Sequence, residues 1–241
     1  YGMLLLDCGC AGDVARIEAK CVELGRPLSD IKLAVATHAH PDHLGGAAKL
    51  RRKYAIPIAA HPEIDLWYRG AGGFIQHKVD SFFANWVAMK SGRHIQSVRY
   101  KRSIRPDYHI EGGMRLPKFV GWEVFYIPGH TSHDIALYQA ESKMLYWGDS
   151  ICSANGKLHL PVPVLYPGLM RQSLQKMVAL EPQQLLLAHG GVFQVKNQDL
   201  LTEQVNAVLN QEVNPHINRL QRYFLFSKAA RQGLIKYDGF L

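Results

Sequence analysis

The chain has 241 residues, of which 47% are hydrophobic, and this is enough to bury a sizeable core. The length fits one large domain or two small ones, and we favour a single domain spanning 1–241. No run approaches the roughly 18 apolar residues that a membrane-spanning helix needs, so we expect no membrane span. The formal net charge of +8 predicts attraction to anions, which leaves acidic metabolites, nucleic acid and an anionic membrane surface as partners.

The first sixty residues alternate predicted strands and helices. Buried aliphatic runs predict the strands, and Asp13 stands where it would cap a helix whose last apolar residue is Leu24. The alternation favours an α+β class with α/β layers. The predicted elements are strands at 4–6, 31–37 and 56–60, and helices at 14–24 and 45–54.

Residues 63–108 break this alternation, and we interpret them as a helical insertion over the core. The segment mixes aromatic and basic side chains, and Gly70–Gly73 is expected to be flexible. Two interpretations stay open. The aromatics pack a small helical subcore, or the segment forms a lid whose basic residues meet an anionic group of the substrate. Exposed aromatics here would also suit a homodimer contact.

After the insertion, each predicted strand ends close to a histidine or an aspartate. The strand at 121–127 precedes His130, and a hairpin of 135–139 with 144–147 leads to Asp149. The remaining predicted elements are a helix at 169–180, a strand at 185–187 before His189, and C-terminal helices within 197–241 that break at Asn214–Pro215.

Four potential metal ligands lie within six residues after the second strand: His38, His40, Asp42 and His43. His38 and His40 are two apart in extended chain, so they point the same way and can reach one ion. Asp42 and His43 follow a turn at Pro41 and can face a second ion. Mixed imidazole and carboxylate donors suit zinc and also accept manganese, iron or cobalt.

Together with His130, Asp149 and His189, this pattern resembles that of the metallo-β-lactamase superfamily over nearly all of residues 4–191. The resemblance implies a four-layer αβ/βα sandwich with two metal ions at one edge of the sheets. By the same resemblance, His38, His40 and His130 would hold one ion, Asp42, His43 and His189 the other, and Asp149 would bridge both. Asp7 would hold a ligand histidine by a hydrogen bond, and Asp42 would serve catalysis.

Details within the motifs narrow the branch that the chain resembles. True β-lactamases of the superfamily lack the bridging aspartate, so Asp149 favours the glyoxalase II, lactonase and phosphodiesterase branches. His40 stands where related diiron flavoproteins carry glutamate, which disfavours an oxygen-reducing centre. Ser132–Asp134 replace the customary residues after Gly-His-Thr, and His133 is expected to support a turn or a ligand.

The resulting hypothesis is a hydrolase of an ester, thioester or lactone of a small, anionic metabolite, with a hydroxide held between two ions as the nucleophile. Tyr166 or a tyrosine of the insertion is considered as a donor to the oxyanion. Phosphodiester hydrolysis and a metal-binding module without turnover are the alternatives, and nucleic acid is the less favoured partner.

The four cysteines bear on the compartment. Cys8, Cys10, Cys21 and Cys152 lack the paired spacing of structural zinc sites, and we interpret them as small buried residues. That usage fits a reducing cytoplasm, which is the expected location. A removed targeting segment before Tyr1 is left open.

Overall fold

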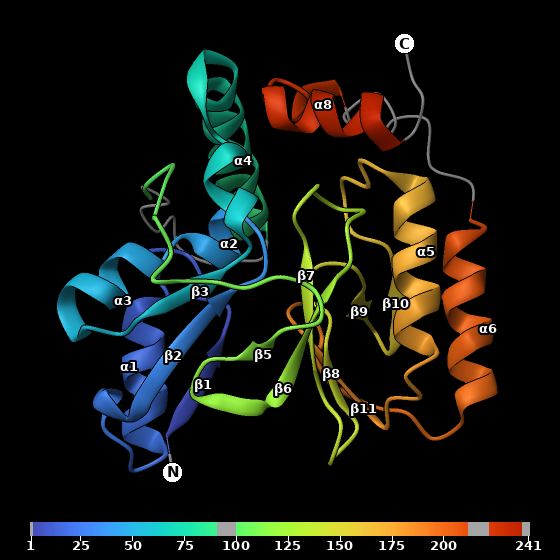
Figure 1. The fold of residues 1–241 in the computed structure, drawn as a ribbon, viewed down its shortest axis with the longest axis horizontal. Coiled ribbons are helices and arrows are strands. Elements are labelled where there is room, and N and C mark those ends of the chain that lie inside the picture. Colours follow the sequence, from blue (N-terminus) through green and yellow to red (C-terminus); the bar gives the residue numbers. More distant parts are fainter. Residues whose placement is uncertain (1, 91–99, 212–221, 238–241) are drawn as a thin grey trace. The chain divides into compact units, whose positions relative to one another are not determined.

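The structure of the chain, a computed structural model, describes residues 2–90, 100–211 and 222–237 (Figure 1). It divides into two compact units. Unit 1 consists of Tyr1–Ile110 and Phe226–Lys228, and unit 2 of Glu111–Leu225 and Ala229–Leu241.

Unit 1 is built on a four-stranded parallel sheet in the order β1-β2-β3-β4. Leu33, Ala34, Val35 and Ala36 in the second strand are fully buried, as expected where both faces of a parallel sheet are covered. The elements are β1 (Met3–Leu6), α1 (Val14–Glu23), η1 (Leu28–Asp30), β2 (Ile31–Ala36), α2 (Pro41–Leu44), α3 (Ala47–Tyr54), β3 (Ile58–Ala60), η2 (Pro62–Leu66), α4 (Gly70–Lys90) and β4 (Tyr108–His109).

Unit 2 is built on a six-stranded mixed sheet in the order β12-β11-β8-β7-β6-β5, in which only β11 and β8 pair in parallel. A separate hairpin joins β9 and β10. The elements are β5 (Arg115–Leu116), β6 (Phe119–Tyr126), β7 (Ile135–Gln139), β8 (Met144–Tyr146), β9 (Cys152–Ala154), β10 (Lys157–His159), α5 (Pro167–Val178), β11 (Gln184–Leu187), β12 (Gly191–Gln194), α6 (Gln198–Leu209) and η3 (Arg222–Phe224).

Helices α5 and α6 cover one face of the six-stranded sheet. Met170 and Leu174 from α5 and Leu201 from α6 share one apolar cluster with Leu145 and Leu185 from the strands. This arrangement buries the apolar stripe of each amphipathic helix against a sheet. The predicted α/β class is therefore confirmed.

Two local predictions in unit 1 are wrong. Leu24 is the C-cap that follows α1 and is 57% exposed, so it does not belong to the buried apolar face of the helix. Asp13 does stand at the N-cap position, but its carboxylate accepts from the backbone N–H of Cys10 (2.9 Å) rather than from the helix.

The insertion is more regular than predicted. Gly70–Gly73, expected to be flexible, opens the 21-residue helix α4. Trp67 and Tyr68 are buried as a helical subcore requires, whereas other aromatics of the segment are exposed, among them Phe82 and Trp86. The basic residues at 93 and 99 lie outside the described residues.

The C-terminal region contains α6 and α8 (Lys228–Tyr237), as the prediction of helices required. The predicted break at Asn214–Pro215 lies outside the described residues. Among the helices that the structure describes, none combines the length and the apolar character needed to cross a membrane.

Candidate metal centre

The buried strand β2 determines where the first group of potential ligands lies in unit 1. The strand ends at Ala36, Thr37 and His38 follow it directly, and His40 then stands at the N-cap of α2, which begins at Pro41. Proline suits the first position of a helix because the N–H it lacks would have no intrahelical partner there. The single turn of α2 carries Asp42 and His43, so all four donors come from one short segment.

Two glycines let this segment pack closely against the turn after β1. A Cβ on Gly45 would lie 2.2 Å from the carbonyl oxygen of Pro41, and one on Gly46 would lie 2.2 Å from that of Cys8. The backbone N–H of Gly46 donates to the carbonyl of Gly9 (2.8 Å), which fixes the approach. Any larger residue would push the donors away from this turn.

His38 and His40 aim ring nitrogens at one another. Nε2 of His38 lies 3.1 Å from Nδ1 of His40, and the rings meet edge to face. Two imidazole nitrogens bound to one tetrahedral zinc at about 2.0–2.1 Å are roughly 3.3 Å apart. The observed separation therefore fits two ligands of a single ion.

The other nitrogens of two of these histidines are held by neighbouring side chains. Nδ1 of His38 lies 3.1 Å from Oγ1 of Thr37, and Nδ1 of His43 lies 2.7 Å from Oδ2 of Asp7. Each contact leaves Nε2 as the ligand atom, which is how an outer group fixes the tautomer of a metal-binding histidine. Asp7 makes the contact that its predicted role requires, and it also accepts from the backbone N–H of Thr37 (2.7 Å).

Asp80, in the middle of α4, is a site residue that the sequence did not suggest. Its carboxylate oxygen lies 3.9 Å from Nε2 of His40, and it accepts hydrogen bonds from Tyr68 (2.7 Å) and Gln76 (2.7 Å). Burial raises the pKa of Asp80 to about 7. No local signal links Asp80 to His40, because the two residues are 40 positions apart.

Unit 2 brings its three predicted ligands together from separate elements. His130 follows β6, Asp149 follows β8, and His189 follows β11. Nε2 of His130 lies 3.7 Å from Oδ2 of Asp149, and Nε2 of His189 lies 3.3 Å from Oδ1 of the same carboxylate. Asp149 thus turns one oxygen toward each histidine. Nδ1 of His130 is held by the carbonyl oxygen of Pro163 (2.6 Å).

Asp134 supports the loop that carries His130. Its carboxylate accepts from the backbone N–H of Thr131 (2.6 Å) and from the Thr131 hydroxyl (2.6 Å), and burial raises its pKa to about 6. Its neighbour His133, for which a supporting role is predicted, is fully buried in the same loop.

Tyr166 does not match the role considered for it. The side chain is fully buried, and its hydroxyl donates to the carbonyl oxygen of Ala230 (2.9 Å) within unit 2. It therefore anchors α8 instead of offering a proton to a substrate.

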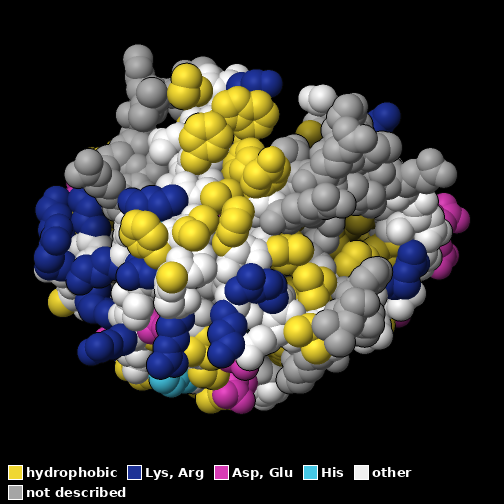
Figure 2. All heavy atoms as spheres, turned by 90° about the horizontal axis from the view of Figure 1, so that it is seen from above, with side chains coloured by type: hydrophobic (Ala, Val, Ile, Leu, Met, Phe, Trp, Pro, Cys, Tyr) yellow, Lys and Arg dark blue, Asp and Glu magenta, His cyan; other side chains and the backbone are white. Residues whose placement is uncertain are grey.

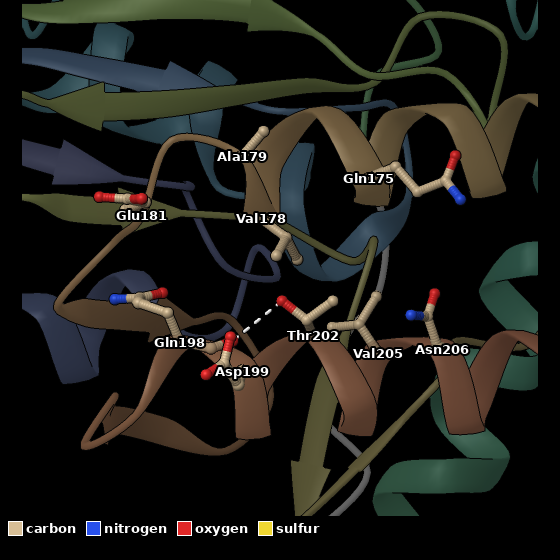
Figure 3. A pocket seen from close by; sticks show the side chains of 9 residues that line it. All are labelled: Gln175, Val178, Ala179, Glu181, Gln198, Asp199, Thr202, Val205 and Asn206. Carbon is tan, nitrogen blue, oxygen red and sulfur yellow. Dashed lines mark hydrogen bonds between the residues drawn. The ribbon is translucent and has the colours of Figure 1, made fainter.

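A surface pocket in unit 2 contains none of these residues. Figure 3 shows it between α5 and α6, lined by amide, carboxylate and hydroxyl side chains such as Gln175, Asp199 and Thr202. None of the residues that line this pocket belongs to the metal-ligating groups. The candidate site for metal binding and catalysis is therefore formed by the histidine and aspartate groups described above.

The donor chemistry of both groups fits divalent transition metals. His38 with His40, Asp42 with His43, and Asp149 with His189 each offer ligand atoms within 4.8 Å of one another. Imidazole nitrogen with carboxylate oxygen is the mixture that zinc, iron, manganese and cobalt accept. Each group alone provides fewer donors than two ions need.

Comparisons with known proteins agree with this chemistry. The family model described as "Metallo-beta-lactamase superfamily" matches residues 2–189. A probable metallo-hydrolase of Bacillus subtilis, YflN, is 23% identical over 225 residues, which cover 86% of this chain and 82% of that protein. The hydroxyacylglutathione hydrolase GloC of Haemophilus influenzae is 22% identical, covering 83% and 85% of the two chains.

Solved structures share the fold. The archaeal superfamily protein ST1585 from Sulfolobus tokodaii superposes with a TM-score of 0.62 at 20% identity, over 98% of this chain and 90% of that one. TTHA1623, solved in a di-iron-bound form, gives a TM-score of 0.57 at 23% identity, over 83% and 86% of the two chains.

Proposed function

Because the chain belongs to the metallo-beta-lactamase superfamily and is a metal-dependent hydrolase, we propose that it cleaves an ester, thioester or lactone of a small metabolite. The proposal includes a single domain in which the ligands of units 1 and 2 meet around two divalent ions, most simply zinc. Iron stays in the test, because TTHA1623 was solved with two irons.

We assign the ligands as the donor chemistry and the superfamily pattern suggest. His38, His40 and His130 would hold one ion, Asp42, His43 and His189 would hold the second, and Asp149 would be shared between the two. The observation that carries this assignment is the Asp149 carboxylate, whose two oxygens lie 3.7 Å and 3.3 Å from two different histidines. A carboxylate that served one ion would not need to divide its oxygens in this way.

When bound, two divalent ions would lower the pKa of a bound water toward about 7, so that a nucleophile would be available at neutral pH. The protein provides the rest. Asp42, whose side chain is 38% exposed, would orient the attacking water and accept its proton. Asp7 and Thr37 keep the ring nitrogens of His43 and His38 in the tautomers that bind metal.

The substrate class rests on two observations. Asp149 favours the branches that act on esters, thioesters and lactones, and GloC is named a hydroxyacylglutathione hydrolase. The net charge of +8 favours an anionic group on the substrate and also supports a second candidate, phosphodiester hydrolysis.

A panel of p-nitrophenyl esters, lactones, thioesters and bis-p-nitrophenyl phosphate, offered to metal-loaded protein, tests the proposal. We expect turnover of at least one carboxylic ester or lactone class, with His38→Ala and Asp149→Ala inactive and metal analysis giving two ions per chain. Turnover confined to the phosphodiester would favour the second candidate. No turnover on any substrate with two ions bound would contradict both.

A further inference from the structure

The polarity of α4 is inverted. An amphipathic surface helix normally turns its apolar stripe inward and its polar residues outward. In α4 the buried positions include Gln76, His77 and Asp80, whereas large apolar side chains face outward. The exposed large apolar side chains of α4 are Phe74 (48%), Ile75 (46%), Phe82 (64%), Trp86 (45%), Val87 (54%) and Met89 (56%).

The buried polar side of the helix makes several hydrogen bonds within unit 1. Gln76 and Tyr68 donate to Asp80, and Gln76 also accepts from the backbone N–H of Phe226 (3.0 Å). Nε2 of His77 lies 3.2 Å from the carbonyl oxygen of Tyr100. These bonds fix which side of α4 faces inward, so the apolar side must face outward.

Most of these outward side chains lie along one side of the helix. Phe74, Lys78, Phe82 and Trp86 recur every four residues and therefore share a face of the helix. Ile75 and Met89 lie on the same side. Viewed from above, Figure 2 shows a group of hydrophobic side chains on this part of the surface, with Lys and Arg side chains beside it.

The charges on this face are positive. The charged residues of α4 are Lys78, Asp80 and Lys90, and Asp80 is buried. The ammonium of Lys90 lies 4.4 Å from the ring centroid of Trp86. The ammonium of Lys78 lies 5.4 Å from the ring centroid of Phe74. The Arg102 guanidinium lies 5.3 Å from the same Phe74 ring. Cations thus flank the apolar side chains without an exposed acid on the helix.

We propose that α4 docks the protein onto the surface of an anionic lipid bilayer, an inference that does not depend on the proposed reaction. Apolar and aromatic side chains enter the boundary between headgroups and acyl chains, while lysines reach lipid phosphates with their ammonium groups. The attraction of polybasic segments to anionic lipid adds to this burial.

The charge argues against two other occupants. A second copy of this chain would bring its own lysines and its net charge of +8 to the same contact, and like charges repel. Single-stranded nucleic acid stacks its bases on aromatic rings within a basic groove. The aliphatic Ile75 and Met89 on an outward helix face serve a bilayer better than they serve bases.

Sedimentation of the full chain with vesicles tests the proposal. We expect binding to phosphatidylcholine vesicles that contain phosphatidylserine, at roughly three to one, and little binding to phosphatidylcholine alone. Lys78→Gln and Lys90→Gln should each weaken partitioning about fivefold, and added salt should weaken it further. Trp86→Ser should weaken it about tenfold or more.

The matched control is Val22→Ser, because Val22 is an equally apolar side chain, 77% exposed on α1. It should leave binding unchanged, and circular dichroism should show that every variant is folded. A blue shift of tryptophan emission on adding vesicles, lost in Trp86→Phe, provides a readout independent of affinity. Equal binding by Trp86→Ser and Val22→Ser would overturn the proposal. The proposal would also be overturned if the wild type self-associated or bound an oligonucleotide and only Trp86→Ser abolished that binding.

Discussion

The two groups of ligands differ in how the chain builds them. In unit 1, four donors come from six consecutive residues after one strand, and side chains such as Asp7 and Thr37 hold their rings. In unit 2, three donors follow the ends of three strands, and the ring of His130 is held by a backbone carbonyl, that of Pro163. The first group therefore depends on local sequence, and the second depends on strand order.

This difference determines what each group tolerates. The histidines of unit 1 keep their spacing wherever β2 and α2 form, because both elements lie within 14 residues. The donors of unit 2 stay together only if β6, β8 and β11 keep their places in the sheet. Single substitutions in the two groups should consequently have different effects.

Asp149→Ala should have the largest effect, because this carboxylate is the donor that the proposal shares between two ions. We expect activity to fall roughly a thousandfold, since a bound metal supplies several kcal/mol of stabilisation. Metal content per chain should also fall below two. Asp199→Ala, which removes an exposed carboxylate on α6, should retain activity and metal.

Asp134→Asn tests the support of the unit 2 group through pH. The pKa of Asp134 is raised to about 6 from 3.8, so the folded chain binds the proton more tightly than the unfolded chain does. The corresponding stability is fully present below pH 3.8 and is lost as the pH rises through 6. In metal-free protein the wild type should lose up to about 3 kcal/mol across this range.

The Asn variant should lack this part of the pH dependence. Urea denaturation at several pH values, with a chelator present, measures how the free energy of unfolding depends on pH. Parallel pH profiles for wild type and variant would show that Asp134 does not titrate in this window.

Asp7→Asn tests the corresponding support in unit 1. Asp7 lies 2.7 Å from Nδ1 of His43, and the amide of asparagine could no longer stabilise the ring as a carboxylate does. Metal affinity should fall about 10–100-fold, the usual effect of removing an outer partner of a ligand histidine. Competition with a chromogenic chelator measures the affinity, and Asp30→Asn, on the surface of the same unit, is the matched control.

Asp80→Asn should have the smallest effect. Its oxygen lies 3.9 Å from His40, which is longer than a hydrogen bond, so we expect less than a tenfold loss of metal affinity. The same chelator titration applies. A loss as large as that of Asp7→Asn would mean that α4 supports the unit 1 donors as strongly as the turn after β1 does.

The sequence predicts the elements with strong periodicity and misses those without it. Strands β1, β2, β6, β7, β8 and β11 were expected because each is an aliphatic run or an alternating pattern. The short strands β4 and β5 have two residues each, and β12 is mostly exposed, so none carries a hydrophobic pattern. Helix α4 was not recognised in full because its glycines and inverted polarity contradict the usual signals.

The residues of the candidate site also fall into those that the sequence predicts and those that it does not. The seven predicted ligands could be named because strand ends and residue chemistry point to them. Asp80 and Asp134 could not, because their contacts depend on tertiary packing that no spacing along the chain reveals. Thr37 was within reach of prediction, since it adjoins His38 directly after the predicted strand.

The two glycines after the ligand segment have a consequence for directed evolution of this protein. A saturation library would admit almost any residue at an exposed position such as His109, but Gly45 and Gly46 leave no room even for alanine. A search for new substrate preferences should therefore vary residues around the proposed metal site that are neither ligands nor these two glycines. Randomising positions 45 and 46 would yield mostly inactive clones.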